Sequence, residues 1–343
     1  MEYSRENKTM NRTARAFLIA AFFGMISSSF GQDAKLMEAA KKEGRVVLYG
    51  TMQTDILDLI KNAFHKRTGI TIDYWRGSST KVMDRALSES RAGKPLFDLV
   101  MSTEDSMRIM LKEGLFIRYD SPINRDFPKE AIDPQLGPRA RNHIIGIVYN
   151  KSVIKPAEAP KSLEDLLKPQ YRGKLVMPDP TQHTTTTQWL ANVHKLIGKE
   201  KADRFIRELA AAKPILVESF NPSSDRILTG ETPIGLTYVY YVFLHGQKGA
   251  DLDYMRTEKL LGDASYMTLS NKAAHPNAAK AFIDFFLDDE SMKLMAKAGE
   301  FVNRKGVYPP VPDADKIQFV EMDDLGEKMY AEKRKEFHKL FLR

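Results

Sequence analysis

The sequence predicts an α/β protein of two lobes, each a mainly parallel sheet flanked by helices, with a hinge and a central cleft. Short apolar runs alternate with amphipathic runs of helical period over residues 45–113, and this alternation is typical of parallel sheets with helices on both faces. The length of 343 residues exceeds one average domain. A Pro-rich stretch, 122–138, precedes the apolar run 144–149, where we expect the chain to cross between lobes.

The expected elements follow from hydrophobic periodicity and from glycines that end helices. Ile56, Ile60 and Phe64, for example, share one face of a helix that ends before Gly69. We predict helices over residues 33–43, 55–66, 81–91, 104–113, 202–211, 224–229, 276–287, 291–298 and 328–342, with one around Trp189 and one beginning at the tyrosines 240–241. We predict strands over residues 45–49, 70–74, 97–101, 144–149, 174–177, 215–218, 234–237 and 264–269.

The predicted crossings divide the mature chain into two discontinuous lobes. We assign residues 32–140 with 260–300 to the first lobe, and residues 141–259 with 301–343 to the second.

Residues 1–31 are expected to form a secretory signal peptide. Arg12 and Arg15 precede an apolar run over residues 17–26, and small residues follow it, as in a cleavable leader. The run is too short for a comfortable membrane span. We therefore predict export to the periplasm; an uncleaved anchor, which would make the chain a membrane-tethered sensor, is the alternative.

Composition narrows the class of protein further. The net charge is +7, but the basic residues are interleaved with acidic ones and no zinc-finger or aromatic-basic RNA motif occurs, so we expect no nucleic-acid partner. The sequence has no cysteine, which excludes disulfides, thiolate metal sites and a cysteine nucleophile. These features fit a soluble, monomeric protein of a bacterial periplasm.

Sequence motifs of enzymes are missing. We find no Gly-x-Ser-x-Gly elbow, and no His-Glu-x-x-His, Gly-x-Gly-x-x-Gly or phosphate-loop lysine motif. Scattered Ser, His and Asp residues leave an α/β enzyme open as an alternative, but a binding protein is favoured.

The adjacent tyrosines Tyr240 and Tyr241 are the best clue to a ligand. They follow the short apolar run 234–237. A multivalent cation lowers the pKa of groups that bind it, so two phenolates joined by one carboxylate would carry three negative charges and suit a trivalent metal. The alternative is that one tyrosine lies in the core and the other at the surface.

Five loops are expected at the carboxyl ends of strands, where open α/β sheets bind ligands and helix N-termini favour anions. These loops comprise residues 50–54, 77–80, 101–105, 181–187 and 220–224.

Several fragments stand in the order of a known family: RVVLYG (45–50), PLFDLVM (95–101), GIVYNK (146–151), YRGKLVMPDP (171–180), GETP (230–233) and HPNAAKAFIDF (275–285). Together they resemble the periplasmic substrate-binding proteins of bacterial ABC importers, in the branch of ferric-ion-binding proteins (extracellular solute-binding protein family 1). The resemblance covers residues 42–310 and implies a type II periplasmic-binding-protein fold that closes on its ligand and delivers it to a membrane permease and its ATPase.

The resemblance also implies a ligand set. Tyr240 and Tyr241 match the ferric-binding pair, and Glu104 resembles the family's acidic ligand, although a surface carboxylate at a helix N-terminus is equally open there. Gln53 stands where some members have a histidine. The remaining candidates, for a synergistic anion or another ligand, are Ser78, Ser79, Thr80, His183, Thr184, Thr185, Thr186, Asn221 and Tyr238.

Two cargoes therefore remain open. The first is ferric iron, held with a synergistic anion by the tyrosines and Glu104. The second is a small phosphorylated or carboxylated organic anion, held by helix N-termini and hydroxyls with the tyrosines as a wall. His183 is interpreted as a helix-capping residue and not as a metal ligand.

Overall fold

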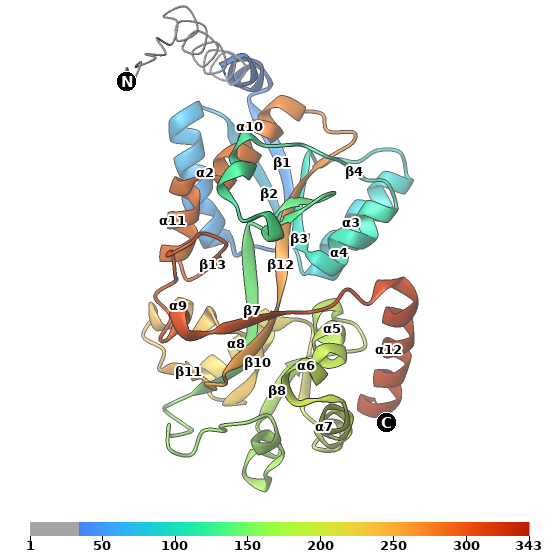
Figure 1. The fold of residues 1–343 in the computed structure, drawn as a ribbon, viewed down its shortest axis with the longest axis vertical. Coiled ribbons are helices and arrows are strands. Elements are labelled where there is room, and N and C mark those ends of the chain that lie inside the picture. The colour runs from blue at the N-terminus through green and yellow to red at the C-terminus, as the bar shows by residue number, and fades with distance from the viewer. Residues whose placement is uncertain (1–33, 343) are drawn as a thin grey trace, which may run out of the picture.

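The structure is a computed structural model that describes residues 34–342. The predicted signal peptide, residues 1–31, lies outside the described residues. Figure 1 shows two lobes, one above the other, with β7 (Arg141–Asn150) and β12 (Lys259–Ser270) running between them. Among the residues that the structure describes, no helix is both long and apolar enough to cross a membrane.

The first lobe is built on three parallel strands. β1 lies between β2 and β3, with Arg45 opposite Thr71 and Leu48 opposite Leu99. A helix follows each strand closely, which places the loops at the carboxyl edge of the sheet. The elements are a helix over residues 34–43, β1 (Arg45–Gly50), α2 (Thr54–Thr68), β2 (Thr71–Arg76), α3 (Ser79–Arg91), β3 (Leu99–Thr103), α4 (Glu104–Lys112) and β4 (Phe116–Ile117).

The second lobe repeats this plan. β8 lies between β10 and β9 and is parallel to both. Its elements are β8 (Leu175–Pro178), α5 (Thr184–Asn192), α6 (His194–Ile197), α7 (Lys199–Ala211), β9 (Ile215–Val217), α8 (Phe220–Thr229), β10 (Ile234–Tyr238), α9 (Tyr241–Gly246) and β11 (Leu252–Tyr254).

The long strands β7 and β12 join the two half-sheets. They pair antiparallel, with Ile144 opposite Gly262 and Arg141 opposite Ser265. β12 continues antiparallel along β3, whereas β7 continues antiparallel along β10. Each strand therefore belongs to the sheets of both lobes, and the crossing predicted at residues 144–149 lies within β7.

The remaining elements cover the two lobes from outside. α10 (Pro276–Leu287) and α11 (Asp289–Lys297) pack on the first lobe, whereas α12 (Gly326–Phe341) packs against α5 and α7. The short strands are β5 (Ile132–Asp133), β6 (Gly137–Pro138), β13 (Phe301–Val302) and β14 (Gln318–Glu321), and the 3-10 helices are Pro122–Asp126, Lys129–Ala131, Glu164–Leu167, Pro169–Tyr171 and Ala314–Lys316.

Separate apolar clusters fill the two halves. One contains Phe64 and Phe282, whose rings meet edge to face at 5.1 Å. A second cluster, around Tyr49 and Phe97, also lies in the first lobe, and a third contains Trp189, Phe205 and Phe337 from the helices of the second lobe. On this basis we retain, as a proposal, the division into residues 32–140 with 260–300 and residues 141–259 with 301–343.

The α/β class and the alternating order of the elements are confirmed. One difference concerns the site: the helix expected over residues 224–229 begins at Phe220. Ser219 is fully extended and Phe220 is buried, so the aromatic side chain anchors the first turn. The N-terminus of α8 consequently reaches the cleft.

Gly235 provides a test of the packing in the second lobe. It pairs with Val176 in the register of β10 and β8, and a Cβ on Gly235 would overlap the Val176 carbonyl oxygen. We predict that Gly235→Ala lowers the free energy of unfolding, measured in urea, by roughly 1–3 kcal/mol. Gly246→Ala is the control, because no atom lies within 4 Å of a Cβ there; equal stabilities of the two variants would contradict the packing.

Candidate functional site

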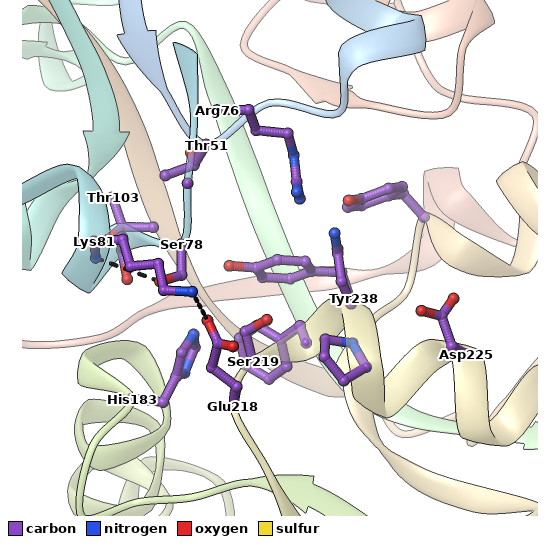
Figure 2. A pocket seen from close by; sticks show the side chains of 16 residues that line it. Thr51, Arg76, Ser78, Lys81, Thr103, His183, Glu218, Ser219, Asp225 and Tyr238 are labelled. Carbon is purple, nitrogen blue, oxygen red and sulfur yellow. Dashed lines mark hydrogen bonds and ion pairs between the residues drawn. The ribbon is translucent and has the colours of Figure 1, made fainter.

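A cavity of about 340 Å³ lies between the lobes. Figure 2 shows its side chains, which enter from the upper and the lower lobe. The lining residues are Thr51, Arg76, Gly77, Ser78, Ser79, Lys81 and Thr103 from the first lobe, and His183, Glu218, Ser219, Phe220, Asn221, Pro222, Asp225, Tyr238 and Tyr240 from the second.

The first lobe presents strand ends and a helix N-terminus to this cavity. Arg76 is the last residue of β2, and Ser78 caps α3 by accepting a hydrogen bond from the Lys81 backbone N–H at 3.3 Å. Thr103 ends β3 and immediately precedes α4. Hydroxyls and a positive helix end therefore face the cavity from above, an arrangement that favours anions.

The second lobe contributes two further helix N-termini and an aromatic wall. His183 caps α5 through Nδ1, which accepts from the Thr186 backbone N–H, as expected for a capping residue. Burial lowers the pKa of His183 to about 4, so this imidazole is neutral at neutral pH. The wall consists of Phe220, Tyr238 and Tyr240, with ring centroids 4.4 and 5.6 Å apart along the series.

Both tyrosines of the pair are buried. The Tyr240 and Tyr241 rings lie 4.4 Å apart and are tilted by 31°. Gln53 donates from Nε2 to the Tyr241 hydroxyl at 2.8 Å. Burial raises the pKa of Tyr240 to about 12 and that of Tyr241 well above its ordinary value. Both phenols are therefore protonated at neutral pH unless a cation displaces their protons.

A guanidinium lies next to this pair. The side-chain amide of Asn221 is oriented so that both of its polar atoms have partners. Its oxygen accepts hydrogen bonds from Arg76 Nη1 at 3.2 Å and Gln53 Nε2 at 3.1 Å, and its nitrogen donates to the Tyr241 hydroxyl. One amide thus separates the charge of Arg76 from the phenol of Tyr241. Among the described residues, Arg76 makes no ion pair with a carboxylate.

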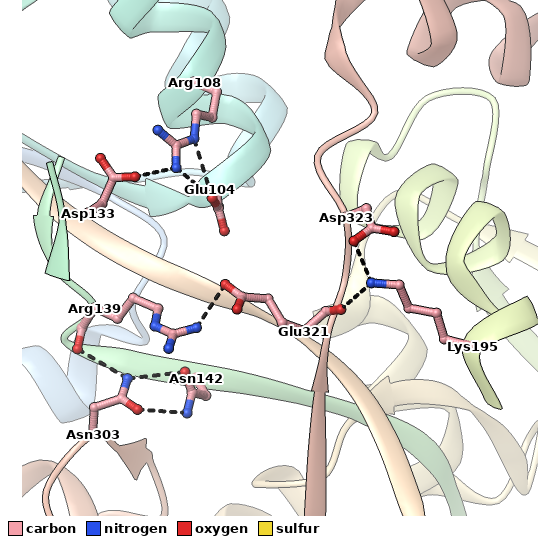
Figure 3. Close-up of polar contacts among 9 residues, drawn as sticks. All are labelled: Glu104, Arg108, Asp133, Arg139, Asn142, Lys195, Asn303, Glu321 and Asp323. Carbon is pink, nitrogen blue, oxygen red and sulfur yellow. Dashed lines mark hydrogen bonds and ion pairs between the residues drawn. The ribbon is translucent and has the colours of Figure 1, made fainter. Parts of the chain in front are cut away.

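Glu104 is not brought to the tyrosine pair. It binds Arg108 at 2.9 Å, and Arg108 also binds Asp133; Figure 3 shows the three together at α4. Thr103 lines the cavity instead. Successive residues of a helix are rotated by about 100° around its axis. Glu104, one residue after Thr103, therefore points away from the cavity, where its carboxylate binds Arg108.

The other predicted residues divide into two groups. Ser78, Ser79, His183, Asn221 and Tyr238 line the cavity, whereas Gln53 contacts it through Asn221 and Tyr241. The threonines do not line the cavity. Thr184 and Thr80 make hydrogen bonds between the lobes, to the Ser79 hydroxyl at 2.9 Å and the Gln182 carbonyl at 3.4 Å. Thr186 bonds His183 at 2.9 Å, and Thr185 is fully buried.

Direct contacts connect the lobes around the cavity. Besides Ser79 and Thr184, Lys81 forms an ion pair with Glu218 at 3.0 Å. The structure therefore represents a closed arrangement of the cleft.

The candidate ligand residues omitted part of the lining, chiefly Thr51, Arg76, Lys81, Thr103, Glu218, Phe220 and Asp225, although Thr51, Thr103 and Phe220 lie in loops that were expected to bind a ligand. Arg76 carried a usable signal, because it is the last residue before the Gly-Ser turn that caps α3. Glu218 and Asp225 carried no such signal, because Asp and Glu residues occur throughout the sequence. Among the described residues, no group of three or more His, Cys, Asp or Glu side chains is arranged to hold a metal ion.

The chain matches the model of the family "Bacterial extracellular solute-binding protein" over residues 94–328. A probable ABC transporter periplasmic-binding protein of Sinorhizobium fredii is 31% identical over 73% of this chain and 70% of its own. An Fe(3+)-binding periplasmic protein of Serratia marcescens is 22% identical over 79% and 81%. A putative 2-aminoethylphosphonate-binding periplasmic protein of Salmonella typhi is 26% identical over 44% and 43%.

Solved structures share the fold. The periplasmic binding protein AfuA of Actinobacillus pleuropneumoniae, with exogenous fructose-6-phosphate bound, has a TM-score of 0.77 at 19% identity, covering 87% of this chain and 99% of its own. Iron-bound HitA of Pseudomonas aeruginosa has a TM-score of 0.70 at 22% identity, covering 85% and 99%. These neighbours establish the type II periplasmic-binding-protein fold.

Asp105, buried below the lobe contact, provides a test by pH. It accepts a hydrogen bond from the Thr103 hydroxyl, and burial, reinforced by Asp263, raises its pKa from 3.8 to about 6. Its contribution to stability is complete below pH 3.8 and is lost as the pH rises through about 6. We predict that Asp105→Asn gains stability relative to wild type over this window, by on the order of 2 kcal/mol in urea unfolding.

Asp165 is a control of opposite sign. A hydrogen bond from Lys168 lowers its pKa, so its contribution is present above pH 3.8 and is lost as the pH falls. Asp165→Asn should therefore lose stability relative to wild type at neutral pH and recover it in acid. A stability difference for Asp105→Asn that stays constant with pH would contradict the assigned burial effect.

Proposed function

The chain belongs to the bacterial extracellular solute-binding protein family, a family of transport proteins and not of enzymes, and we propose that its cargo is a small organic anion with a phosphate, phosphonate or carboxylate group. As a periplasmic component of an ABC transporter, it passes its ligand to a membrane permease driven by an ATPase. We propose that it acts as a monomer after removal of residues 1–31.

The observation that carries this proposal is Arg76, whose guanidinium faces the cavity beside Asn221 and Tyr241 without a carboxylate partner among the described residues. A fixed positive charge repels a trivalent cation and attracts an anion, and at short range in a protein such terms reach several kcal/mol. A guanidinium also matches the geometry of phosphate and carboxylate oxygens through paired N–H donors.

The size and lining of the cavity support the same cargo. Its volume of about 340 Å³ is within the range of about 300–1,000 Å³ common for organic ligands. Hydroxyls of Thr51, Ser78 and Thr103 and the N-terminus of α3 lie on the side of Arg76, where they would donate to anionic oxygens. The shared fold with sugar-phosphate-bound AfuA and the name of the Salmonella relative support an organic phosphate or phosphonate.

Ferric iron is the second candidate, favoured by one observation: the buried rings of Tyr240 and Tyr241 lie 4.4 Å apart, and Tyr240 lines the cavity. The Fe(3+)-binding Serratia relative supports it. This proposal requires the metal to displace two phenol protons beside Arg76 without Glu104. A synergistic anion bound at Arg76 would supply the missing negative charge.

The organic-anion proposal predicts an essential role for Arg76. With fructose-6-phosphate, glycerol 3-phosphate, inorganic phosphate and citrate as probes, at least one should raise the melting temperature, because a ligand that binds the folded state stabilises it. Arg76→Gln should weaken that binding about tenfold or more, as expected for a lost charged hydrogen bond. Arg91→Gln, at the far end of α3 where Arg91 pairs with Glu113 at the surface, should bind normally; undiminished binding by Arg76→Gln would refute the proposal.

The iron candidate predicts colour. Ferric citrate added to the apo protein should give a visible iron–phenolate band that Tyr240→Phe and Tyr241→Phe each weaken and that the double variant abolishes. Tyr254→Phe is the control, since Tyr254 bonds the Pro312 carbonyl within the second lobe. A colourless wild-type protein at saturating ferric citrate would eliminate this candidate.

A further inference from the structure

A second cavity, of about 230 Å³, lies beside β7 in the second lobe. Its walls come from β7, α5, α6, the loop over residues 161–164 and the segment that joins β11 to β12, in the lower half of Figure 1. α5 borders both cavities: its N-cap His183 lines the one between the lobes, and Trp189, further along the helix, lines the second. The two cavities share no lining residue among those described, so the second is a separate space.

The second cavity has a mainly apolar lining. Its buried apolar side chains are those of Ile145, Ile147, Leu163, Trp189, Met255 and Leu260. An apolar protein cavity of about 150 Å³ is known to bind benzene. A volume of about 230 Å³ therefore accommodates one aromatic ring with a short substituent.

The charged residues of this lining balance each other. Lys161 and Lys259 are matched by Glu164 and Glu258, and both lysines and Glu258 are exposed to solvent. The lining therefore offers no net charge that would select an ion. An ionised group placed among the buried apolar side chains would lose its hydration without a compensating partner, so the cavity is suited to an uncharged molecule.

One polar group of the lining lacks a partner. Trp189 is 2% exposed, and its buried Nε1–H has no hydrogen-bond acceptor among the described residues. The lining hydroxyls are satisfied within the protein: Ser162 Oγ accepts from the Asp165 backbone N–H at 3.2 Å, and Thr257 Oγ1 donates to the Lys259 carbonyl at 2.9 Å. An indole N–H can only donate, and a buried donor without an acceptor costs free energy. A ligand with an acceptor oxygen would remove that cost.

From these observations we infer that the second lobe holds a second ligand site, for an uncharged, compact apolar molecule with one acceptor oxygen, such as an aryl ketone. The apolar body packs among the buried side chains of the lining, and the oxygen accepts a hydrogen bond from Trp189 Nε1. This inference does not depend on the cargo proposed for the cavity between the lobes, because the two sites share no described lining residue.

The test compares acetophenone with α-methylstyrene, in which a methylene group replaces the carbonyl oxygen. By titration calorimetry at pH 7, wild type should bind both compounds. Trp189→Phe keeps an aromatic ring but loses the N–H, so it should bind acetophenone about tenfold more weakly than wild type does and α-methylstyrene equally well. In isotope-labelled wild type, acetophenone but not α-methylstyrene should move the indole N–H resonance of Trp189 downfield; the other indole, Trp75, is identified by the resonance that Trp75→Phe removes.

Leu196→Trp fills the cavity from α6 and should abolish the binding of both compounds. Leu59→Trp, at an exposed position of α2 in the first lobe, is the matched control and should bind both as wild type does. The inference is overturned if wild type does not bind acetophenone, if Trp189→Phe binds it undiminished, or if binding survives Leu196→Trp. An unmoved Trp189 resonance with acetophenone bound would also overturn it, and that measurement requires no change in the cavity.

Discussion

The antiparallel pairing of β7 with β12 is the constraint on which the rest of the structure depends. Across it, His143 lies opposite Asp263, with Nδ1 and Oδ1 3.0 Å apart and both side chains buried. Burial lowers the pKa of His143 to about 3 and raises that of Asp263 well above its ordinary value, so burial disfavours the charged form of both groups. The two sheets are thereby held with their carboxyl edges facing each other, and the cavity forms where those edges meet.

Charge compensation near the crossing limits which carboxylates could join the tyrosines in holding a ligand. Arg141 at the start of β7 is buried with Glu300; burial tends to lower the pKa of Arg141, but Glu300 raises it overall. Glu300 is the carboxylate whose charge acts most on Tyr240, and it is already paired with Arg141. Removing one member of such a buried pair is costly, so Glu300 is not free to serve a ligand.

Pairing with a nearby arginine also decides the position of Glu104. A carboxylate one residue past a strand end can turn toward the cleft or toward its own helix, and Arg108 one helical turn later offers a partner at 2.9 Å. Asp133 binds the same guanidinium from outside the helix, which fixes Arg108 in place. The cavity receives the neutral hydroxyl of Thr103 instead, beside Arg76 and the aromatic wall.

The sequence by itself determined the α/β class, the order of strands and helices, and the loops that supply the site, because periodicity, caps and strand ends are local properties. It also identified Ser78, His183 and Asn221 as cavity residues, since each stands at a helix N-terminus. Only the tertiary structure decided which charges share the cavity: Arg76 lies in the first half of the chain and Asp225 in the second, and their relation depends on how two sheets close, which no local pattern records.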